Sequence, residues 1–266
     1  KIIIFGAGTA GMGVTQQLYG YLCENGIDKE TAKKMFWLVD RCGLLTTRSN
    51  DVTENQSHFL RSADELSSDD TNKPVSQQLF TLVEQVKPTI LIGCSAQPGA
   101  FNENIVRKMH EHCQRPIILP LSNPTEKAEA NPADLYRWTE GAVITATGSP
   151  FPALQDGDKT VNFSQCNNYL AFPGIGMGVM SVGAKQVTTS MLHAASHALS
   201  EIKNSNDSAI LPGIKDAAAA SKKIAIAVGT EARKQGLATI DGDVEKLIND
   251  IAWKPQYLEY FKANKD

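Results

Sequence analysis

Residues 1–13 read KIIIFGAGTAGMG, an aliphatic run followed at once by a glycine-rich loop. The run over Lys1–Phe5 has the length of a buried β-strand, and apolar residues at helical spacing predict a helix over Met12–Cys23. Between them, Gly6 to Gly11 fit the pattern GxGxxG. Directly after a strand and at the start of a helix, this pattern predicts a loop that binds the pyrophosphate of a dinucleotide.

The three glycines of this loop have separate predicted tasks. Gly6 lets the chain turn tightly, Gly8 leaves room for the pyrophosphate to approach the backbone, and Gly11 lets helix and strand pack closely. The main-chain N–H groups at the start of the helix, around Thr9 and Ala10, then face the anion. The alternative is a glycine-rich turn that binds no ligand.

The second predicted strand ends in a carboxylate. Asp40 follows the apolar run Met35–Val39, where its side chain can accept hydrogen bonds from the ribose 2′-hydroxyl of NAD. It lies 29 positions after Gly11, against the usual spacing of about 20, and an extra helix capped by Asp28 accounts for the difference. Asp40 repels a 2′-phosphate and Arg41 attracts one. Arg41 can turn into solvent, but the short side chain of Asp40 cannot move away from the ribose, so we expect NAD to bind better than NADP. The alternative is that Asp40 only caps a helix or forms a turn.

Strands alternate with helices over the following residues. Buried strands are expected at Thr89–Gly93, Pro116–Leu121 and Ala142–Ala146, and amphipathic helices at Val75–Val86, Asn102–His112 and Ala133–Thr139. Residues 46–73 are rich in Ser, Thr, Asn and Asp, which predicts mostly loop with at most one short strand. The predicted fold class is therefore α/β, a doubly wound and mostly parallel sheet of the Rossmann type.

From residue 172 onward the pattern is helical. One apolar stripe, which predicts a long amphipathic helix, consists of Met180, Ala184, Val187, Met191, Ala195 and Leu199, and residues 214–236 are rich in alanine. We therefore expect a nucleotide-binding domain over 1–167 and a helical extension over 168–266. The tail over 243–261 predicts a short helix whose aromatic residues Trp253, Tyr257 and Tyr260 dock onto a neighbouring surface.

Further candidate ligand-binding residues follow the later strands. Gly93, Ser95 and Ala96 come after one predicted parallel strand, and Asn123 comes after the next. The carboxyl ends of such strands are where open α/β sheets bind ligands, so we expect these residues near the nicotinamide half of the cofactor. The amide of Asn123 suits a carboxamide, a ribose or a substrate hydroxyl. Spacing alone equally allows a simple turn at Asn123-Pro124.

Other features favour structural roles. Gly174–Gly178 resembles a phosphate loop, but no acidic residue at a strand end follows it, so close backbone packing is expected. His193 and His197 share a helix face opposite the apolar stripe and lack the Glu of HExxH, which predicts a solvated pair rather than metal ligands. His110 and His112 suit the end of a helix.

Composition excludes several classes of partner. The 266 residues carry a net charge of −3 without a basic cluster, which argues against nucleic acid. No apolar run approaches the roughly 18 to 20 residues that span a bilayer, so no membrane partner is expected. Five scattered cysteines and no leader predict reduced thiols and a cytoplasmic protein. Because Lys1 lies inside the first strand, we expect an excised fragment.

No catalytic residue is assigned. A dehydrogenase needs a group that takes the proton of the substrate hydroxyl, and no His or Lys stands convincingly in a loop at the carboxyl edge of the predicted sheet.

Six segments spread over nearly the whole chain carry a family resemblance. They are FGAGTAGMG (5–13), LVDRCGL (38–44), GCSAQPGAFNEN (93–104), LSNPT (121–125), TEGAVITATGSPF (139–151) and CNNYLAFPG (166–174). In this order and spacing they resemble the cofactor-binding half of malic enzyme, the decarboxylating malate dehydrogenase.

The resemblance implies oxidative decarboxylation of L-malate to pyruvate and CO2 with reduction of NAD. A hydride would pass to the nicotinamide, and Mg²⁺ or Mn²⁺ would polarise the new carbonyl. It also implies that Asn123 and Asn167 reach malate and the cofactor, and that members are homo-oligomers. NADP-using relatives tend to carry a small residue and then a lysine after the aspartate, so Arg41-Cys42 favours NAD.

The family's lysine base, tyrosine acid and carboxylate metal ligands precede the glycine loop. The resemblance therefore implies that a missing N-terminal malic domain supplies them, and that this fragment alone is inactive.

Two other functions are considered. A Rossmann-type module that senses a dinucleotide without chemistry would lack the tyrosine, lysine and Glu-Asp pair upstream of Lys1. Another hydroxy-acid or amino-acid dehydrogenase would leave the segments LSNPT and NNYLAFPG unexplained.

Overall fold

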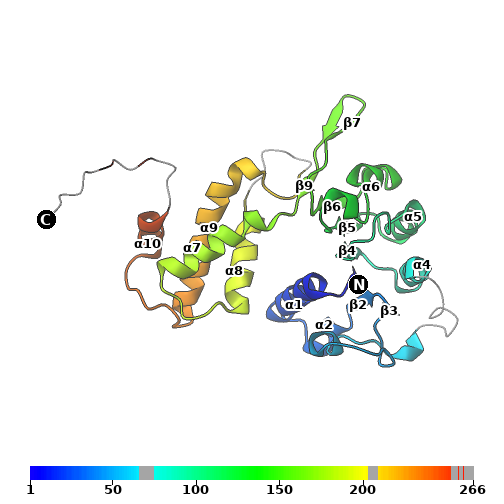
Figure 1. Cartoon of the computed structure of the whole chain (residues 1–266), viewed down its shortest axis with the longest axis horizontal. Coiled ribbons are helices and arrows are strands. Elements are labelled where there is room, and N and C mark those ends of the chain that lie inside the picture. The colour runs from blue at the N-terminus through cyan, green and yellow to red at the C-terminus, as the bar shows by residue number, and fades with distance from the viewer. Residues whose placement is uncertain (66–74, 203–208, 253–256, 258–259, 261–266) are drawn as a thin grey trace.

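Two groups of elements lie side by side in the computed structural model, which describes residues 1–65, 75–202, 209–252, 257 and 260. Figure 1 shows a sheet with flanking helices in one group, and the helices α7, α8, α9 and α10 in the other.

Within the described chain, seven strands form one sheet in the order β3-β2-β1-β4-β5-β6-β9. They are β1 (Ile2–Phe5), β2 (Phe36–Asp40), β3 (Gly43–Leu44), β4 (Ile90–Gly93), β5 (Ile117–Pro120), β6 (Ile144–Thr147) and β9 (Ser164–Gln165). Each strand pairs in parallel with its neighbour, except that β3 is antiparallel to β2. The predicted doubly wound, mostly parallel sheet is confirmed.

Both faces of the sheet are covered, which explains why β1, one of its inner strands, is a continuous apolar run. Ile3 and Phe5 pack in a core with residues of α4 (Val75–Val86), α5 (Glu103–His112) and α6 (Pro132–Trp138). Ile2 and Ile4 point to the opposite face, toward α1 (Thr9–Glu24). Figure 1 shows α4, α5 and α6 together on one side of the strands and α1 on the other.

The polar stretch after β3 holds more structure than predicted. Before β2, the predicted extra helix is present as α2 (Lys29–Lys33), and its predicted cap Asp28 accepts the N–H of Thr31. Beyond β3, the expected loop contains the helix α3 (Glu54–Ser57) and a 3-10 turn, η1 (Ala63–Glu65). The rest of this stretch, residues 66–73, lies outside the described residues.

The second group consists of α7 (Phe172–Ser181), α8 (Thr189–Ser200), α9 (Ala217–Lys234) and α10 (Val244–Ile251). It has a core of its own, formed by Val182, Met191, Ala195, Ile224, Val228 and Ala232. A Cβ atom added to Gly174 would lie 2.7 Å from the carbonyl oxygen of Ser221, and one added to Gly178 would lie 2.6 Å from that of Ala225. The prediction that these glycines allow close backbone packing is confirmed.

The predicted long helix through the apolar stripe is wrong. α7 ends at Ser181 and α8 begins at Thr189, so the stripe is divided between two helices. Gly183, with φ of +58°, turns the chain after α7, and Thr188 caps α8 by accepting the N–H of Met191. Helical spacing across the break was therefore accidental, and Met180 and Val187 are 71% and 50% exposed.

Four further short elements complete the described chain. They are η2 (Thr125–Lys127), the hairpin of β7 (Leu154–Asp156) and β8 (Lys159–Val161), η3 (Asn168–Leu170) and η4 (Ile214–Asp216). One of them, η3, leads from β9 into α7. Figure 1 shows the hairpin projecting from the sheet group.

The predicted solvated histidine pair is also wrong for one member. His193 is only 6% exposed, because α8 packs on α1. Its Nδ1 atom lies 2.6 Å from Oε2 of Glu24, and its Nε2 atom lies 3.2 Å from the carbonyl oxygen of Gln17. His197 is exposed, and His193 instead joins the two groups of elements.

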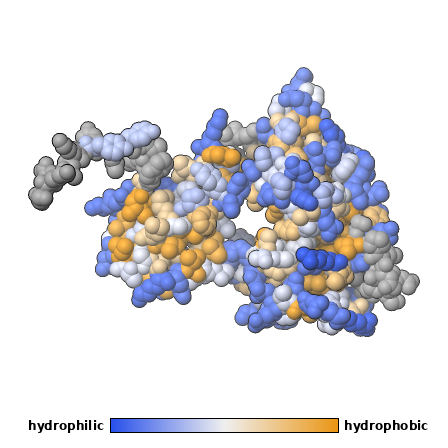
Figure 2. Space-filling view, in the orientation of Figure 1, coloured by the Kyte–Doolittle hydropathy of each residue, from blue (hydrophilic) through white to orange (hydrophobic). Residues whose placement is uncertain are grey.

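Two of the three C-terminal aromatic residues do not dock on the described part of this chain. Tyr257 and Tyr260 are 99% and 96% exposed, and Trp253 lies outside the described residues. Figure 2 shows apolar surface over the helical group, where Phe172 on α7 is 73% exposed. In the described ranges, no helix combines the length and apolarity needed to cross a bilayer.

Candidate dinucleotide-binding site

The glycine loop has the geometry that its predicted tasks require. Gly6 has φ of +103°, and a Cβ atom there would collide with the main chain of Cys94. A Cβ atom on Gly11 would collide with the carbonyl oxygen of Gly6 and lie 3.0 Å from the side chain of Ile4. At Gly8 a Cβ atom would meet nothing within 4 Å, so the space beside this residue is open.

The start of α1 faces the same space. The first intrahelical hydrogen bond runs from the N–H of Met12 to the carbonyl of Gly8, at 2.9 Å. The N–H groups of Thr9, Ala10 and Gly11 precede it, and first-turn N–H groups have no acceptor inside their own helix. Thr9 and Ala10 are exposed. A negative group beside Gly8 would therefore meet main-chain donors and the positive end of the helix.

Asp40 is held at the end of β2 by two hydrogen bonds. Its Oδ1 atom accepts the N–H of Arg41 at 3.0 Å, and its Oδ2 atom accepts from Nε2 of Gln56 at 3.3 Å. The same Gln56 nitrogen donates to the carbonyl of Ala7 at 2.8 Å, so one buried amide links the glycine loop to the aspartate. The site residue Gln56 was missed in the polar stretch. Its capping box with Thr53, a Thr-x-x-Gln pattern, was the available signal.

A crevice of 160 Å³ joins these residues to the loop after β4. Its lining includes Gly6, Gly8, Asp40, Arg41, Ser95 and Gln97. Cys94 also lines it. Burial is the main cause that raises the pKa of this thiol to about 11, and the negative charge of Glu129 is the second. Five residues predicted to bind a cofactor thus share one opening with Gln97, which was not predicted.

Two predicted residues, Gly93 and Ala96, do not line the crevice. Gly93 is buried, and a Cβ atom on it would lie 2.5 Å from the carboxyl carbon of Glu129. Ala96 is exposed, with φ of +54°, and its N–H donates to Oγ of Ser122 at 2.9 Å. Glu129, which is fully buried, was missed because a lone glutamate in a polar segment carries no pattern.

Asn123 follows β5 at the same edge of the sheet. Its Oδ1 atom accepts the hydroxyl of Ser149, which follows β6, at 2.6 Å. The peptide bond to Pro124 is cis. Asn123 itself is exposed, so its amide is oriented by the neighbouring strand and open to a ligand.

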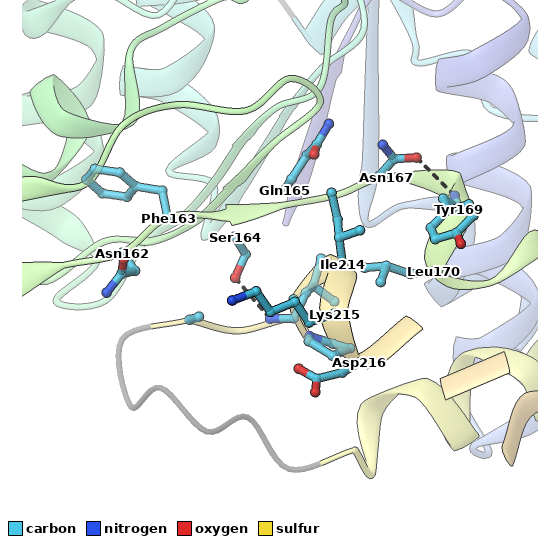
Figure 3. Close-up of a pocket in the computed structure, with 14 residues that line it drawn as sticks. Asn162, Phe163, Ser164, Gln165, Asn167, Tyr169, Leu170, Ile214, Lys215 and Asp216 are labelled. Atoms are coloured by element: carbon cyan, nitrogen blue, oxygen red, sulfur yellow. Dashed lines mark hydrogen bonds between the residues drawn. The ribbon is translucent and has the colours of Figure 1, made fainter. Parts of the chain in front are cut away.

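Asn167 lines a second cavity of 440 Å³ between η3 and η4 (Figure 3). Its Oδ1 atom accepts the N–H of Tyr169 at 3.0 Å. Gln165 and Lys215 line the same cavity, and Nε2 of Gln165 donates to the carbonyl of Gly148 at 3.1 Å. Lys215 was missed, since nothing in the sequence indicates that η4 returns to this edge. Asn123 is not part of this lining, so the structure does not bring the two asparagines together in one cavity.

The described residues hold no group of three or more His, Cys, Asp or Glu side chains that could bind a metal ion. The residues present therefore do not fit a divalent metal site.

The site combines three features: a strand–turn–helix unit with an open glycine position, an aspartate at the end of the next strand, and polar loops at one sheet edge. Together they define a dinucleotide-binding domain of the Rossmann type. The family described as malic enzyme, NAD binding domain, matches residues 1–233. The chain belongs to this family.

Similar proteins agree with that assignment. The chain is 43% identical over 268 residues to the NAD-dependent malic enzyme of Pectobacterium carotovorum, and 44% identical over 270 residues to that of Erwinia tasmaniensis. In both cases the match covers 99% of this chain and 47% of the relative. The chain thus spans about half the length of the curated relatives it matches.

Two solved structures have the same fold. The malic enzyme of Entamoeba histolytica superposes with a TM-score of 0.67 at 24% identity, covering 94% of this chain and 46% of that one. The malic enzyme from Pyrococcus horikoshii superposes with a TM-score of 0.64 at 25% identity, covering 94% of this chain and 52% of that one.

Proposed function

We propose that this domain binds NAD with its pyrophosphate over Gly8 and the start of α1, and its adenosine ribose on Asp40. The observation that carries the proposal is the open space at Gly8, next to the first-turn N–H groups and in one crevice with Asp40. A carboxylate fixed by Gln56 accepts from a ribose hydroxyl and repels a 2′-phosphate. NAD is therefore the favoured form. Arg41 beside Asp40 attracts a 2′-phosphate, so NADP binds as well, but more weakly than NAD.

In the whole protein the proposed activity is oxidative decarboxylation of L-malate to pyruvate and CO2. NAD supplies the hydride acceptor. The part of this chain is to bind and orient the reactants: Ser95 and Asn123 lie along the edge of β4 and β5, and Asn167 lines the second cavity. Lys215 in that cavity offers a positive charge to a substrate carboxylate. The domain boundary is proposed at Asn167, with domains over 1–167 and 168–266, so residues of both domains line that cavity.

The remaining parts of the activity are proposed to come from outside this chain. A Mg²⁺ or Mn²⁺ ion, the base and the acid would be held by a malic domain. Exposed apolar residues on the helical group, such as Phe172 and Met180, suit contact with that domain or with another subunit of a homo-oligomer. Five free cysteines accord with the reducing cytoplasm.

Calorimetric titration with NAD and NADP tests the cofactor assignment. We expect NAD to bind the wild-type chain more tightly than NADP, and Asp40→Ser to reverse the order, because the repulsion of the 2′-phosphate is removed while Arg41 remains. Asp158→Ser, in the exposed turn between β7 and β8, is the matched control and should leave both affinities unchanged. If the folded wild-type chain binds neither nucleotide, the proposed function is wrong.

A further inference from the structure

We propose that Glu129 is a positioning residue for the cofactor: it fixes the hydroxyl of Ser95 as a hydrogen-bond acceptor for the ribose on the nicotinamide side. The inference deepens the proposed binding of NAD and rests on it. Glu129 itself lies behind the loop that follows β4 and does not line the crevice.

The carboxylate of Glu129 is buried and surrounded by donors. Its Oε1 atom accepts the N–H of Ser95 at 2.7 Å, the hydroxyl of Ser95 at 2.8 Å and the hydroxyl of Ser122 at 2.6 Å. The main chain of Glu129 is fixed as well, because its carbonyl accepts the N–H of Phe101 at 3.0 Å. Burial of a carboxylate is costly without such partners, so this side chain and the two loops hold one another in place.

The directions of the two hydroxyl groups follow from their other partners. The N–H of Gln97 lies 3.2 Å from Oγ of Ser95, and the N–H of Ala96 lies 2.9 Å from Oγ of Ser122. A main-chain N–H can only donate, so each hydroxyl oxygen accepts there and gives its own proton to Glu129. The hydroxyl of Ser95 therefore keeps a lone pair for a ligand but has no proton to offer.

This polarity selects the chemical group that Ser95 can bind. Ser95 lines the crevice from β4, which flanks β1 on the side opposite β2 and Asp40. The half of a dinucleotide beyond the pyrophosphate would lie there. Phosphate oxygens are acceptors and make no hydrogen bond with a hydroxyl that cannot donate. The hydroxyls of the second ribose and the carboxamide of the nicotinamide can both donate. The ribose is the group that fits, because it is attached directly to the pyrophosphate and Ser95 shares the crevice with Gly8.

Three ligands distinguish a role of Glu129 at the second ribose from a role in the binding of the whole cofactor. ADP carries the adenosine and the diphosphate, ADP-ribose adds the second ribose, and NAD adds the nicotinamide. In calorimetric titrations of the full chain, Glu129→Gln retains an acceptor oxygen but loses the charge that orients Ser95. We expect it to weaken NAD and ADP-ribose about tenfold, since hydrogen bonds to a charged group are the stronger ones. ADP affinity should stay within about twofold of the wild-type value.

The control and a second variant complete the test. Glu126→Gln removes the same charge from an exposed side chain in the same segment, and all three affinities should be unchanged. Ser95→Ala removes the acceptor itself, so it should also weaken ADP-ribose and leave the affinity for ADP unchanged. This variant tests the inference if Glu129→Gln does not fold. Equal losses for all three ligands, or unchanged ADP-ribose affinity in Ser95→Ala, would overturn the inference. A wild-type chain that binds neither ADP nor NAD would instead overturn the proposed function.

Discussion

At the scale of single residues, the open space beside Gly8 makes a sharp prediction. The backbone there is extended, with φ of −71° and ψ of −164°, so valine fits the conformation. We expect Gly8→Val to fold and to lose at least about tenfold in NAD affinity, because its methyl groups occupy the place of the pyrophosphate. Calorimetry and circular dichroism measure the two effects.

Gly13 provides the matched control for that variant. It lies on the exposed side of α1, and a Cβ atom there also meets nothing within 4 Å. Gly13→Val should keep the NAD affinity of the wild-type chain. Retained affinity in Gly8→Val would contradict the pose of the cofactor.

The residues of the crevice differ in how far they could be predicted. The glycine loop and Asp40 follow from a local pattern, because strand, turn and helix are consecutive in the sequence. Gln56 and Glu129 could not be found that way. Gln56 reaches a carbonyl 49 positions away, and Glu129 reaches a loop 34 positions away. Such contacts depend on strand order, which residue spacing does not encode.

At the scale of elements, the packing of α7 on α9 predicts opposite effects at two glycines of one helix. A Cβ atom on Gly178 would approach the main chain of α9, whereas one on Gly176 meets nothing within 4 Å. We expect Gly178→Ala to destabilise the chain by about 1–3 kcal/mol through overpacking. Gly176→Ala should stabilise it by about 0.5–1 kcal/mol, since alanine favours the helix. Urea unfolding followed by circular dichroism compares them, and effects of the same sign would contradict this account.

Five of the seven strands of the described sheet were predictable because two signals agree at them, whereas β3 and β9, of two residues each, were missed because they are too short to form an apolar run. Apolar runs of strand length alternate with amphipathic segments, and residues such as Asp28 and Asn102 cap the helices that follow. The apolar stripe of the helical group gave a wrong prediction, because its helical spacing continues across the break between α7 and α8. A glycine with positive φ and a capping threonine marked that break, and they outweigh periodicity.

At the scale of the whole molecule, His193 links the helical group to the sheet group. Both of its ring nitrogens lie near oxygen acceptors, on Glu24 and Gln17 of α1. We expect His193→Leu to lower the free energy of unfolding by about 1–3 kcal/mol. Glu24 is 46% exposed, so solvent screens the charge and most of the loss comes from the buried ring.

The neighbouring histidine offers the comparison for this variant. His197 is 64% exposed, and its Nδ1 atom lies 3.5 Å from Glu201. His197→Leu should change the free energy of unfolding by no more than about 0.5 kcal/mol. Equal urea midpoints for the two variants would show that the contact between α1 and α8 contributes nothing.

The order of the strands also determines which state of the chain, native or denatured, can bind a nucleotide. Gly8, Asp40 and Ser95 come from three strand ends that are neighbours in space and distant along the polypeptide. A denatured chain has no such arrangement, so any occupant of the crevice binds the native state alone. Mass action then makes saturation with that occupant a source of thermal resistance, worth about 2.7 kcal/mol at a hundred times its dissociation constant. The melting temperature of the domain thereby becomes a function of nucleotide concentration.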